Sequence, residues 1–308
     1  MLGSTGWGEL NQDLLSRALA YVNVDTVVSG DILKVSASPV LTTLWKRVMK
    51  DFNSTSEHSV PYENAPLGDL RDANTDWEWD TDIIPSAKDI GTLGSGSDYT
   101  VFLDHLGIPS LDFSFGKKAT YGQYHSIYDS FSWIDHFGGH DDKPGSSFEI
   151  MAFGSKVWGV MAMRLANSPL VPLDVIAQGN GLSKYLLFIE NQNVPGLDLT
   201  DLRLAITEYS QSAAEIELIC NNPADDKTLV SCNEKLGLVE RNFLLEQGLP
   251  NRPWFRHVMQ APGMNLGYAA EAFPGIQQAI DDGDVNLAQE QAKVAAERVL
   301  AAAKYLDH

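Results

Sequence analysis

The stretch AYVNVD, residues 20–25, decides the first part of the fold. This short run of β-branched and aromatic residues predicts a strand that ends on Asp25. Two further runs predict strands over residues 32–36 and 108–113. Helices are predicted, mainly from apolar residues at helical spacing, over residues 7–18, 41–48, 98–106 and 146–166. Strands that alternate with helices predict an α/β layer built on a partly parallel sheet.

The second half of the chain has a different pattern. Beyond Pro169 and Pro172 the composition shifts and no strand pattern appears. Helices are predicted over residues 200–220, 228–246 and 285–306. The last one carries an apolar stripe typical of helix–helix contact, formed by Ala288, Ala292, Ala295, Val299, Ala302 and Leu306. The sequence therefore predicts an α/β domain over residues 1–170 and an all-α helical bundle over residues 171–308.

The charge of the chain argues against some classes of partner. The 308 residues include 22 Lys and Arg against 41 Asp and Glu, a formal net charge of −19. This balance argues against nucleic acid, whose phosphates need a basic surface, and against anionic membrane surfaces. No run approaches the roughly 18 apolar residues of a membrane span. The first residues, MLGSTGWGE, also lack the pattern of a signal peptide. Alone, these features favour a cytosolic chain.

Two features point instead to a secretory compartment. Cys220 and Cys232 lie in one polar stretch, where they either form a disulfide or remain two free thiols. A disulfide closing so short a loop would contribute on the order of 3 kcal/mol. Asn53-Ser54-Thr55 is an acceptor sequence for N-glycosylation, although such triplets also occur by chance.

Two segments carry residues with candidate metal chemistry. Asp25 ends a predicted strand, at the edge where open α/β sheets bind ligands, although an aspartate there can equally cap a turn or helix. Tyr124-His125-Ser126 lies in an irregular, glycine-rich segment, where a histidine beside a phenol is either a metal ligand or an ordinary surface or core residue. His136 and His140 have helical ligand spacing, but their context, HFGGHDD, predicts a solvated loop.

A third candidate is the glycine-rich turn made of Gly94, Ser95, Gly96, Ser97 and Asp98. It precedes a predicted helix, so its backbone N–H groups could hold an anion. It lacks the full spacing of a dinucleotide-binding or phosphate-binding loop. The chain also contains no GxSxG or HExxH motif, which argues against a hydrolase of another class.

Several blocks together resemble one known family. In the first half these blocks are LGSTGWGE (2–9), AYVNVDT (20–26), LGSGSDYTVFLDHLGIPS (93–110) and YHSIYDS (124–130). In the second half they are GLPNRPWFRHVMQAP (248–262) and YAAEAFPGIQQAI (268–280). Their order resembles the glutamate carboxypeptidase and transferrin-receptor family, which contains zinc-dependent exopeptidases and inactive relatives. The resemblance implies a zinc-exopeptidase α/β sandwich with a mostly parallel sheet, followed by a helical dimerisation domain.

The resemblance also implies a site with two bridged zinc ions. Asp25 matches one aspartate ligand and His125 matches the last histidine ligand, each for a different zinc ion. Tyr124 matches the tyrosine whose hydroxyl contacts the scissile carbonyl. The turn from Gly94 to Asp98 matches a wall of the substrate cleft. Glu9 matches a calcium-binding glutamate of the family, but its companion position here is Gly6.

The other zinc ligands and the base glutamate of the family precede the LGST block. We therefore expect a C-terminal fragment of a binuclear zinc exopeptidase that is inactive alone, since catalytic zinc needs about three protein ligands per ion. The alternative is a non-catalytic, receptor-like or sorting protein that acts through its helical domain. Retention of Asp25, Tyr124 and His125 favours descent from an active enzyme.

Substrate preference should differ from that of glutamate-specific members. Those members hold the glutamate with a lysine just before the tyrosine of the YAxExFPG block, and here Gly267 precedes Tyr268. They also place arginines where this chain has Leu111-Asp112-Phe113-Ser114-Phe115. Neutral or acidic residues cannot replace a guanidinium that pairs with a carboxylate. We therefore expect a preference for peptides with neutral or basic side chains.

The family also suggests partners and a location. We expect a homodimer whose interface lies within residues 198–306, a peptide substrate, and neither nucleic acid nor a membrane span in this chain. Family members suggest the secretory pathway, the vacuole or a type II membrane protein as the location.

Overall fold

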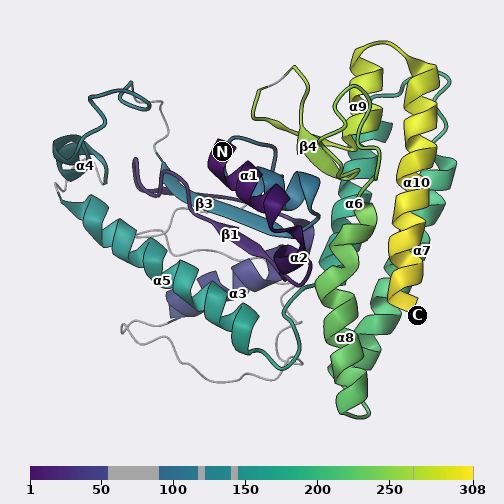
Figure 1. Ribbon diagram of the computed structural model, residues 1–308, viewed down its shortest axis with the longest axis horizontal. Coiled ribbons are helices and arrows are strands. Elements are labelled where there is room, and N and C mark those ends of the chain that lie inside the picture. The colour runs from purple at the N-terminus through teal and green to yellow at the C-terminus, as the bar shows by residue number, and fades with distance from the viewer. Residues whose placement is uncertain (55–89, 117–121, 140–144, 266, 308) are drawn as a thin grey trace.

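A mixed sheet forms the centre of the N-terminal part in the computed structural model, which describes residues 1–54, 90–116, 122–139, 145–265 and 267–307. Strand β3 (Ser110–Gly116) lies between β1 (Tyr21–Asn23) and β2 (Ile32–Ala37). Strand β1 pairs with β3 in parallel and β2 pairs with it antiparallel (Figure 1). The three predicted strands are therefore present, but the expectation of a mostly parallel sheet is not confirmed.

Side chains along β3 point alternately to the two faces of the sheet, and one of these faces is covered by helices. Leu111, Phe113 and Phe115 are buried on one face, among apolar residues of helices α3 (Thr42–Ser54) and α5 (Ser146–Asn167). The ring of Trp45 on α3 lies 5.2 Å from that of Phe113. The residues between them, Asp112 and Ser114, are only partly buried and face the other way.

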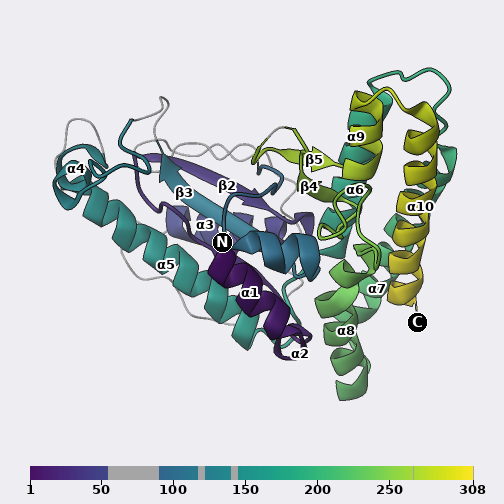
Figure 2. The same cartoon turned by 45° about the horizontal axis from the view of Figure 1, so that its top comes forward.

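On that other side of the sheet lies α1 (Leu2–Leu10), followed by α2 (Gln12–Leu15) (Figure 2). The helix predicted over residues 7–18 is thus two shorter helices, of which the first begins at Leu2 and the second ends at Leu15. The helix predicted from Asp98 is a π-helical turn, Val101–His105. Phe102 in this turn stacks on Tyr21 at 4.0 Å, which joins the turn to β1.

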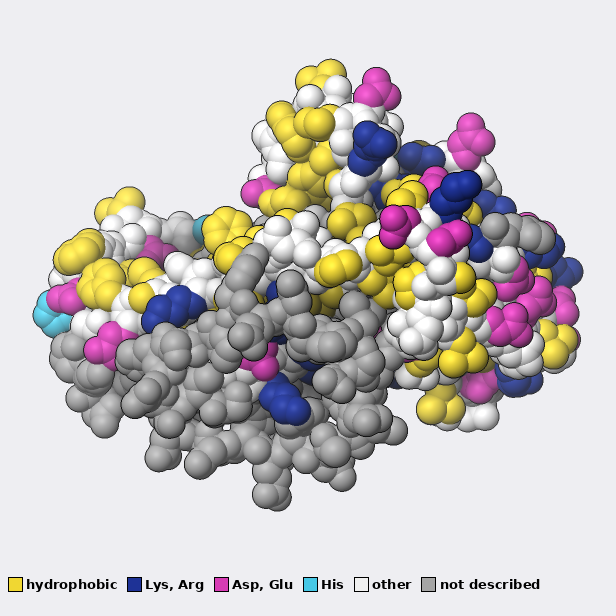
Figure 3. Space-filling model, turned by 90° about the horizontal axis from the view of Figure 1, so that it is seen from below, with side chains coloured by type: hydrophobic (Ala, Val, Ile, Leu, Met, Phe, Trp, Pro, Cys, Tyr) yellow, Lys and Arg dark blue, Asp and Glu magenta, His cyan; other side chains and the backbone are white. Residues whose placement is uncertain are grey.

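The segment after β3 contains one short helix that the sequence did not predict. Helix α4 (Phe131–Phe137) is capped by the Ser130 hydroxyl, which accepts a hydrogen bond from the Trp133 N–H. It includes His136, so the expected loop is wrong there, while His140 lies outside the described residues. Apolar side chains gather over α4 and the start of α5, where Phe131, Phe137 and Phe148 are exposed (Figure 3).

The C-terminal part is mainly a bundle of long helices. They are α6 (Val175–Glu190), α7 (Thr200–Asn221), α8 (Asp226–Leu238), α9 (Pro274–Asp281) and α10 (Val285–Asp307), with a 3₁₀ turn at Val239–Phe243. The predicted alanine stripe of α10 is buried, and α10 packs along α7. Small side chains let these two helices approach closely. In the described residues, no helix is both long enough and apolar enough to cross a membrane.

Two observations refine this part of the prediction. Cys220 and Cys232 form a disulfide between α7 and α8, so of the two alternatives the structure contains the bonded one. The expectation of an all-α bundle is wrong in one place, because β4 (Gln260–Pro262) and β5 (Ala270–Ala272) form an antiparallel hairpin. Strands of three residues are too short to give an alternating pattern in the sequence.

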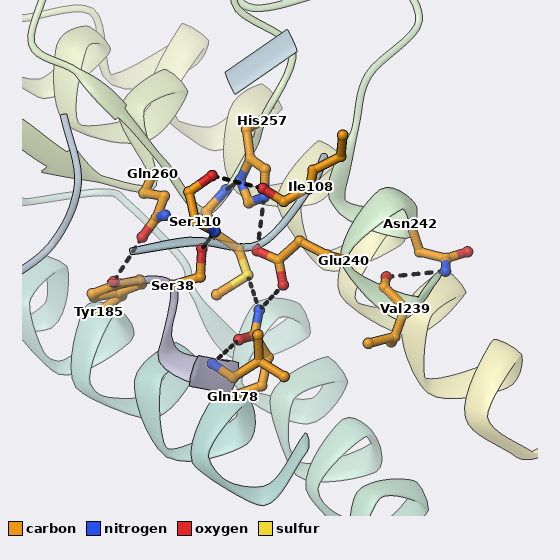
Figure 4. Close-up of polar contacts among 12 residues, drawn as sticks. Ser38, Ile108, Ser110, Gln178, Tyr185, Val239, Glu240, Asn242, His257 and Gln260 are labelled. Carbon is orange, nitrogen blue, oxygen red and sulfur yellow. Dashed lines mark hydrogen bonds and ion pairs between the residues drawn. The ribbon is translucent and has the colours of Figure 1, made fainter. Parts of the chain in front are cut away.

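A buried polar cluster joins the two parts of the molecule (Figure 4). Val40 lies in a 3₁₀ turn beside the sheet, and its N–H donates to Gln178 Oε1 on α6 at 3.0 Å. Gln178 Nε2 in turn donates to Glu240 Oε2 at 2.9 Å. His257 Nδ1 accepts from the Met259 N–H, so its ring proton is on Nε2, which lies 3.1 Å from Glu240 Oε1 and donates to it. We call Gln178, Glu240 and His257 the central polar cluster. The hydrophobic core runs through both parts as well, while the boundary at residue 170 stays a prediction.

Candidate active site

An open cavity of about 710 Å³ lies beyond the end of β1. Besides Met1, four separate segments line it: the end of β1, the glycine-rich turn, the segment after β3, and the loop between β4 and β5. Seven residues singled out in the sequence meet there, namely Asp25, Gly96, Ser97, Asp98, Tyr124, His125 and Tyr268. The fold therefore brings together candidates that are up to 243 positions apart, from Asp25 to Tyr268.

Asp25 is held by a polar network beneath it. Asn23 Nδ2 donates to Asp112 Oδ1 at 2.8 Å and to the Ser97 hydroxyl at 2.9 Å. Burial raises the pKa of the Asp112 carboxyl, while hydrogen bonds from the Asn23 side chain and the Asp25 backbone act in the opposite direction. After Asp25, the backbone of Thr26 lies in the left-handed region with φ 50°, so the chain does not continue in an extended conformation. The Asp25 carboxylate itself is exposed to the cavity.

Tyr124 and His125, from the segment after β3, also line the cavity. Their rings stack with centroids 3.8 Å apart, and both side chains are exposed. His125 has φ 59°, a conformation that costs free energy for a residue with a Cβ atom. The Ser126 hydroxyl donates to the Gln123 carbonyl and accepts from the Tyr128 N–H, which stabilises this turn.

The glycine-rich turn contributes to the cavity in two ways. Gly96, Ser97 and Asp98 line it directly, whereas Gly94 and Ser95 support the wall from behind. A Cβ atom on Gly94 would lie 2.2 Å from the Tyr268 carbonyl oxygen, so only glycine fits there. Asp98 accepts a hydrogen bond from the Ser4 hydroxyl at 2.6 Å and lies 3.6 Å from the amino group of Met1.

Glu9 lies away from the cavity. Its Oε1 accepts a hydrogen bond from the Trp254 indole at 2.6 Å, which joins α1 to the C-terminal part. In this position Glu9 has a structural contact, and the calcium assignment stays a prediction.

The described residues of the cavity do not provide a complete set of zinc ligands. In the ranges that the structure describes, no three His, Cys, Asp or Glu side chains come close enough to hold one metal ion. Catalytic zinc needs about three protein ligands. Asp25 and His125 share the cavity, but the described residues do not by themselves fit a zinc ion.

Comparisons with known proteins match both parts of the chain. Residues 197–307 match the model of the transferrin receptor-like dimerisation domain. A probable glutamate carboxypeptidase of Arabidopsis thaliana is 31% identical over 284 residues, which is 92% of this chain and 38% of that protein. A probable glutamate carboxypeptidase of Arthroderma benhamiae is 32% identical, over 99% of this chain and 41% of that protein. The chain belongs to the glutamate carboxypeptidase and transferrin-receptor-like family.

The family relatives differ in activity and in length. An inactive zinc metalloprotease of Schizosaccharomyces pombe is 29% identical, over 95% of this chain and 35% of that protein. The chain spans about two fifths of the length of the first relatives it matches, at 38% and 41%. Family membership therefore leaves the activity of the whole protein open.

Several residues of this family member's cavity were not predicted. Asn23, Thr26 and Asp129 line it, and Asp112 lies just behind Asn23. The alternation of side chains along a strand could have indicated Asn23 as a cavity residue, because it lies two positions before Asp25 and therefore on the same side of the chain. Asp112 gave no such signal, because its role depends on the neighbouring strand.

The cavity is acidic. Asp25, Asp98 and Asp129 line it, and no lysine or arginine is among the described residues of its wall. An anionic ligand would therefore meet mostly like charges, whereas a cationic or neutral group would not.

Proposed function

We propose that this chain forms part of a binuclear zinc exopeptidase, a carboxypeptidase-like peptide hydrolase, and that the cavity binds its peptide. The observation that supports this proposal is the meeting of Asp25, Tyr124 and His125 in one cavity. Each of the two ligand-type residues would serve a different zinc ion, and the remaining ligands would come from outside the described residues. Alone, the chain would be inactive.

The cavity residues have separate tasks in this proposal. The Tyr124 hydroxyl is an O–H donor that can hydrogen-bond the scissile carbonyl oxygen and stabilise its developing charge. The Tyr268 ring offers an apolar face to a substrate side chain, and the Gly96–Ser97 turn offers backbone N–H groups. No step through zinc follows from the described residues, since they do not complete its ligand set.

The substrate side chain should be neutral or basic. Three aspartates line the cavity, and Gly267 provides no side chain beside Tyr268. A glutamate side chain would lose its hydration without gaining a guanidinium or ammonium partner from the described wall.

The alternative function is a non-catalytic, receptor-like or sorting protein. The incomplete metal-ligand set of the described residues and the similarity to an inactive relative favour it. In either case the helical part would form a homodimer within residues 198–306. Exposed apolar residues on α7, namely Leu204, Leu218 and Ile219, are candidates for that interface. The disulfide supports a secretory or vacuolar location.

Zinc content and peptide hydrolysis test the proposal together. In the natural protein we expect two zinc ions, hydrolysis of dipeptides with C-terminal leucine or lysine, and at least tenfold slower hydrolysis of those with C-terminal glutamate. His125→Ala should lower the zinc content and remove hydrolysis. His136→Ala, which changes an exposed histidine on α4, is the matched control. Full zinc content in the His125→Ala variant would contradict the proposal. Absence of both zinc and hydrolysis in the natural protein would support the non-catalytic alternative.

A further inference from the structure

The β4–β5 hairpin connects the helical part to the cavity wall. Its loop carries Tyr268, whose side chain is 68% exposed and lines the cavity. The Tyr268 carbonyl accepts a hydrogen bond from the Ser95 N–H at 3.2 Å, and the Tyr268 ring packs on Gly96. Gly263 N–H donates to the Ala269 carbonyl at 2.8 Å and closes the loop. The position of Tyr268 therefore depends on how the hairpin is held.

Arg252 contacts both strands of this hairpin. Its Nη1 donates a hydrogen bond to the Pro262 carbonyl on β4. Its Nη2 lies 3.6 Å from Glu271 Oε2 on β5, which makes an ion pair without a hydrogen bond. Arg252 is 10% exposed and Glu271 is 5% exposed. A planar guanidinium with donors on two nitrogens suits this double contact, whereas an ammonium group does not.

Asp104, from the π-helical turn of the α/β part, completes this group. Its side chain is 0% exposed, and neither carboxylate oxygen has a hydrogen-bond partner among the described residues. Its backbone carbonyl accepts from the Arg256 N–H at 2.7 Å and the His257 N–H at 3.2 Å, which ties the 252–257 segment to the turn. Arg252 interacts electrostatically with both Asp104 and Glu271. We call Asp104, Arg252 and Glu271 the hairpin anchor.

We propose that Arg252 is a positioning residue that keeps Tyr268 in the cavity wall by holding both strands of the hairpin beside Asp104. The Glu271 carboxylate, 3.6 Å from Arg252 Nη2, offsets part of the cost of burying this guanidinium. A buried guanidinium is costly unless negative groups surround it. The importance of the Tyr268 position for binding a peptide rests on the proposed function. The role of Arg252 in holding Tyr268 in the cavity wall does not depend on that function.

Native-state hydrogen exchange of the 1–308 chain tests this inference. The Ser95 N–H is the reporter, because it bonds to the Tyr268 carbonyl from the other part of the molecule. In Arg252→Met we expect the amides of Ser95 and of residues 263–270 to exchange at least tenfold faster. The amides of α7 and α10 should keep their rates. Arg252→Lys should remain close to Arg252→Met, because it cannot make both contacts. Arg203→Met, which changes an exposed arginine on α7, should leave all of these amides unchanged.

Either of two results would overturn the inference: wild-type exchange at Ser95 and 263–270, or equal acceleration throughout the helical part. If Arg252→Met does not fold, Glu271→Gln decides, because it keeps the Arg252–Pro262 bond and should give a smaller acceleration confined to the same amides.

Peptide hydrolysis by the natural protein separates this inference from the proposed function. Absence of hydrolysis would contradict the proposed function but leave the exchange result intact. If peptides are hydrolysed, Arg252→Met should raise KM more than it lowers kcat. An unchanged KM together with unchanged exchange would contradict the inference alone.

Discussion

The central polar cluster and the hairpin anchor join the same two parts of the molecule, but their polar atoms are bonded to different extents. In the central cluster, Glu240 uses both carboxylate oxygens and His257 uses both ring nitrogens in hydrogen bonds. In the anchor, both Asp104 oxygens and Glu271 Oε2 have no hydrogen-bond partner among the described residues. A buried polar group without a hydrogen-bond partner costs free energy. The central polar cluster should therefore stabilise the folded state, whereas the hairpin anchor should lower its stability.

This difference agrees with where the two clusters lie. The central cluster holds the 3₁₀ turn beside the sheet against α6 (Figure 4), and none of its residues lines the cavity. The anchor holds the hairpin whose loop forms part of that wall. Segments that form binding sites are commonly taken from the less stable regions of a fold.

The largest effect should come from breaking the central cluster. Glu240→Ala leaves the His257 N–H buried without its acceptor, and it leaves the Gln178 amide nitrogen with only the Met259 sulfur as an acceptor. We expect a loss of about 3–5 kcal/mol in the free energy of unfolding, measured by urea denaturation. Glu246→Ala, which changes an exposed glutamate six positions later, is the control. A loss as small as that of the control would show that the cluster does not stabilise the junction.

Removal of the disulfide should have the next largest effect, and it tests the helical part away from both clusters. Cys220 and Cys232 are 12 positions apart. Closing a loop of this length stabilises the folded state by about 3 kcal/mol in the chain-entropy model. Cys220→Ala combined with Cys232→Ala should lose about that amount, and reduced wild-type protein should unfold at the same urea concentration. Alkylation of the unreduced native protein would contradict the bond itself.

The fold and the site differ in how far the sequence could predict them. Local patterns are enough for the helix at 146–166 and the alanine stripe of α10, which follow the helical period, and for the strand at 20–25, whose β-branched and aromatic residues favour a strand. The hairpin at Gln260–Pro262 and helix α6 were missed. The hairpin strands are too short for a period, and α6 has no counterpart among the predicted helices.

Within the site, motif residues such as Asp25 and His125 were found through a resemblance rather than through local chemistry. Asp104 and Arg252 lie within the family-like blocks at 93–110 and 248–262, yet no local pattern pairs them. Their contact depends on how the helical part packs on the π-helical turn, 148 positions apart in the chain. Such long-range pairs follow from packing, which a single sequence does not encode in any local pattern.

A third contact between the two parts should have an intermediate effect. Asp174 begins α6 and accepts from the Ala177 N–H at 2.9 Å, and its other oxygen accepts from the Thr43 hydroxyl on α3 at 2.6 Å. Asp174→Ala should cost about 1–2 kcal/mol in the free energy of unfolding, because it removes a helix cap and a bond between the parts. Thr43→Val removes only the second bond and should cost about half as much. Equal losses in both variants would mean that the cap itself contributes nothing.

The smallest effect should be a gain, from Asp104→Asn in the hairpin anchor. Burial raises the pKa of the Asp104 carboxyl well above its usual range, and the positive charge of Arg252 only partly opposes this shift. The folded state then binds more protons than the unfolded state between the ordinary pKa of about 3.9 and the raised one. The contribution of this group to stability is therefore present at low pH and is lost as the pH rises through that window.

Asp104→Asn removes this loss, because the amide stays neutral at every pH. We expect the variant to be more stable than wild type at pH 8, because it has no buried carboxyl group to ionise. The difference should shrink as the pH falls toward the ordinary pKa of about 3.9, because the wild-type carboxyl is then protonated in the folded state. Urea denaturation at pH 4, 6 and 8 measures it, and Asp226→Asn, on the exposed start of α8, is the control. A variant less stable than wild type at pH 8 would show that Asp104 is ionised and favourably paired with Arg252. The hairpin anchor would then stabilise the fold, as the central polar cluster does.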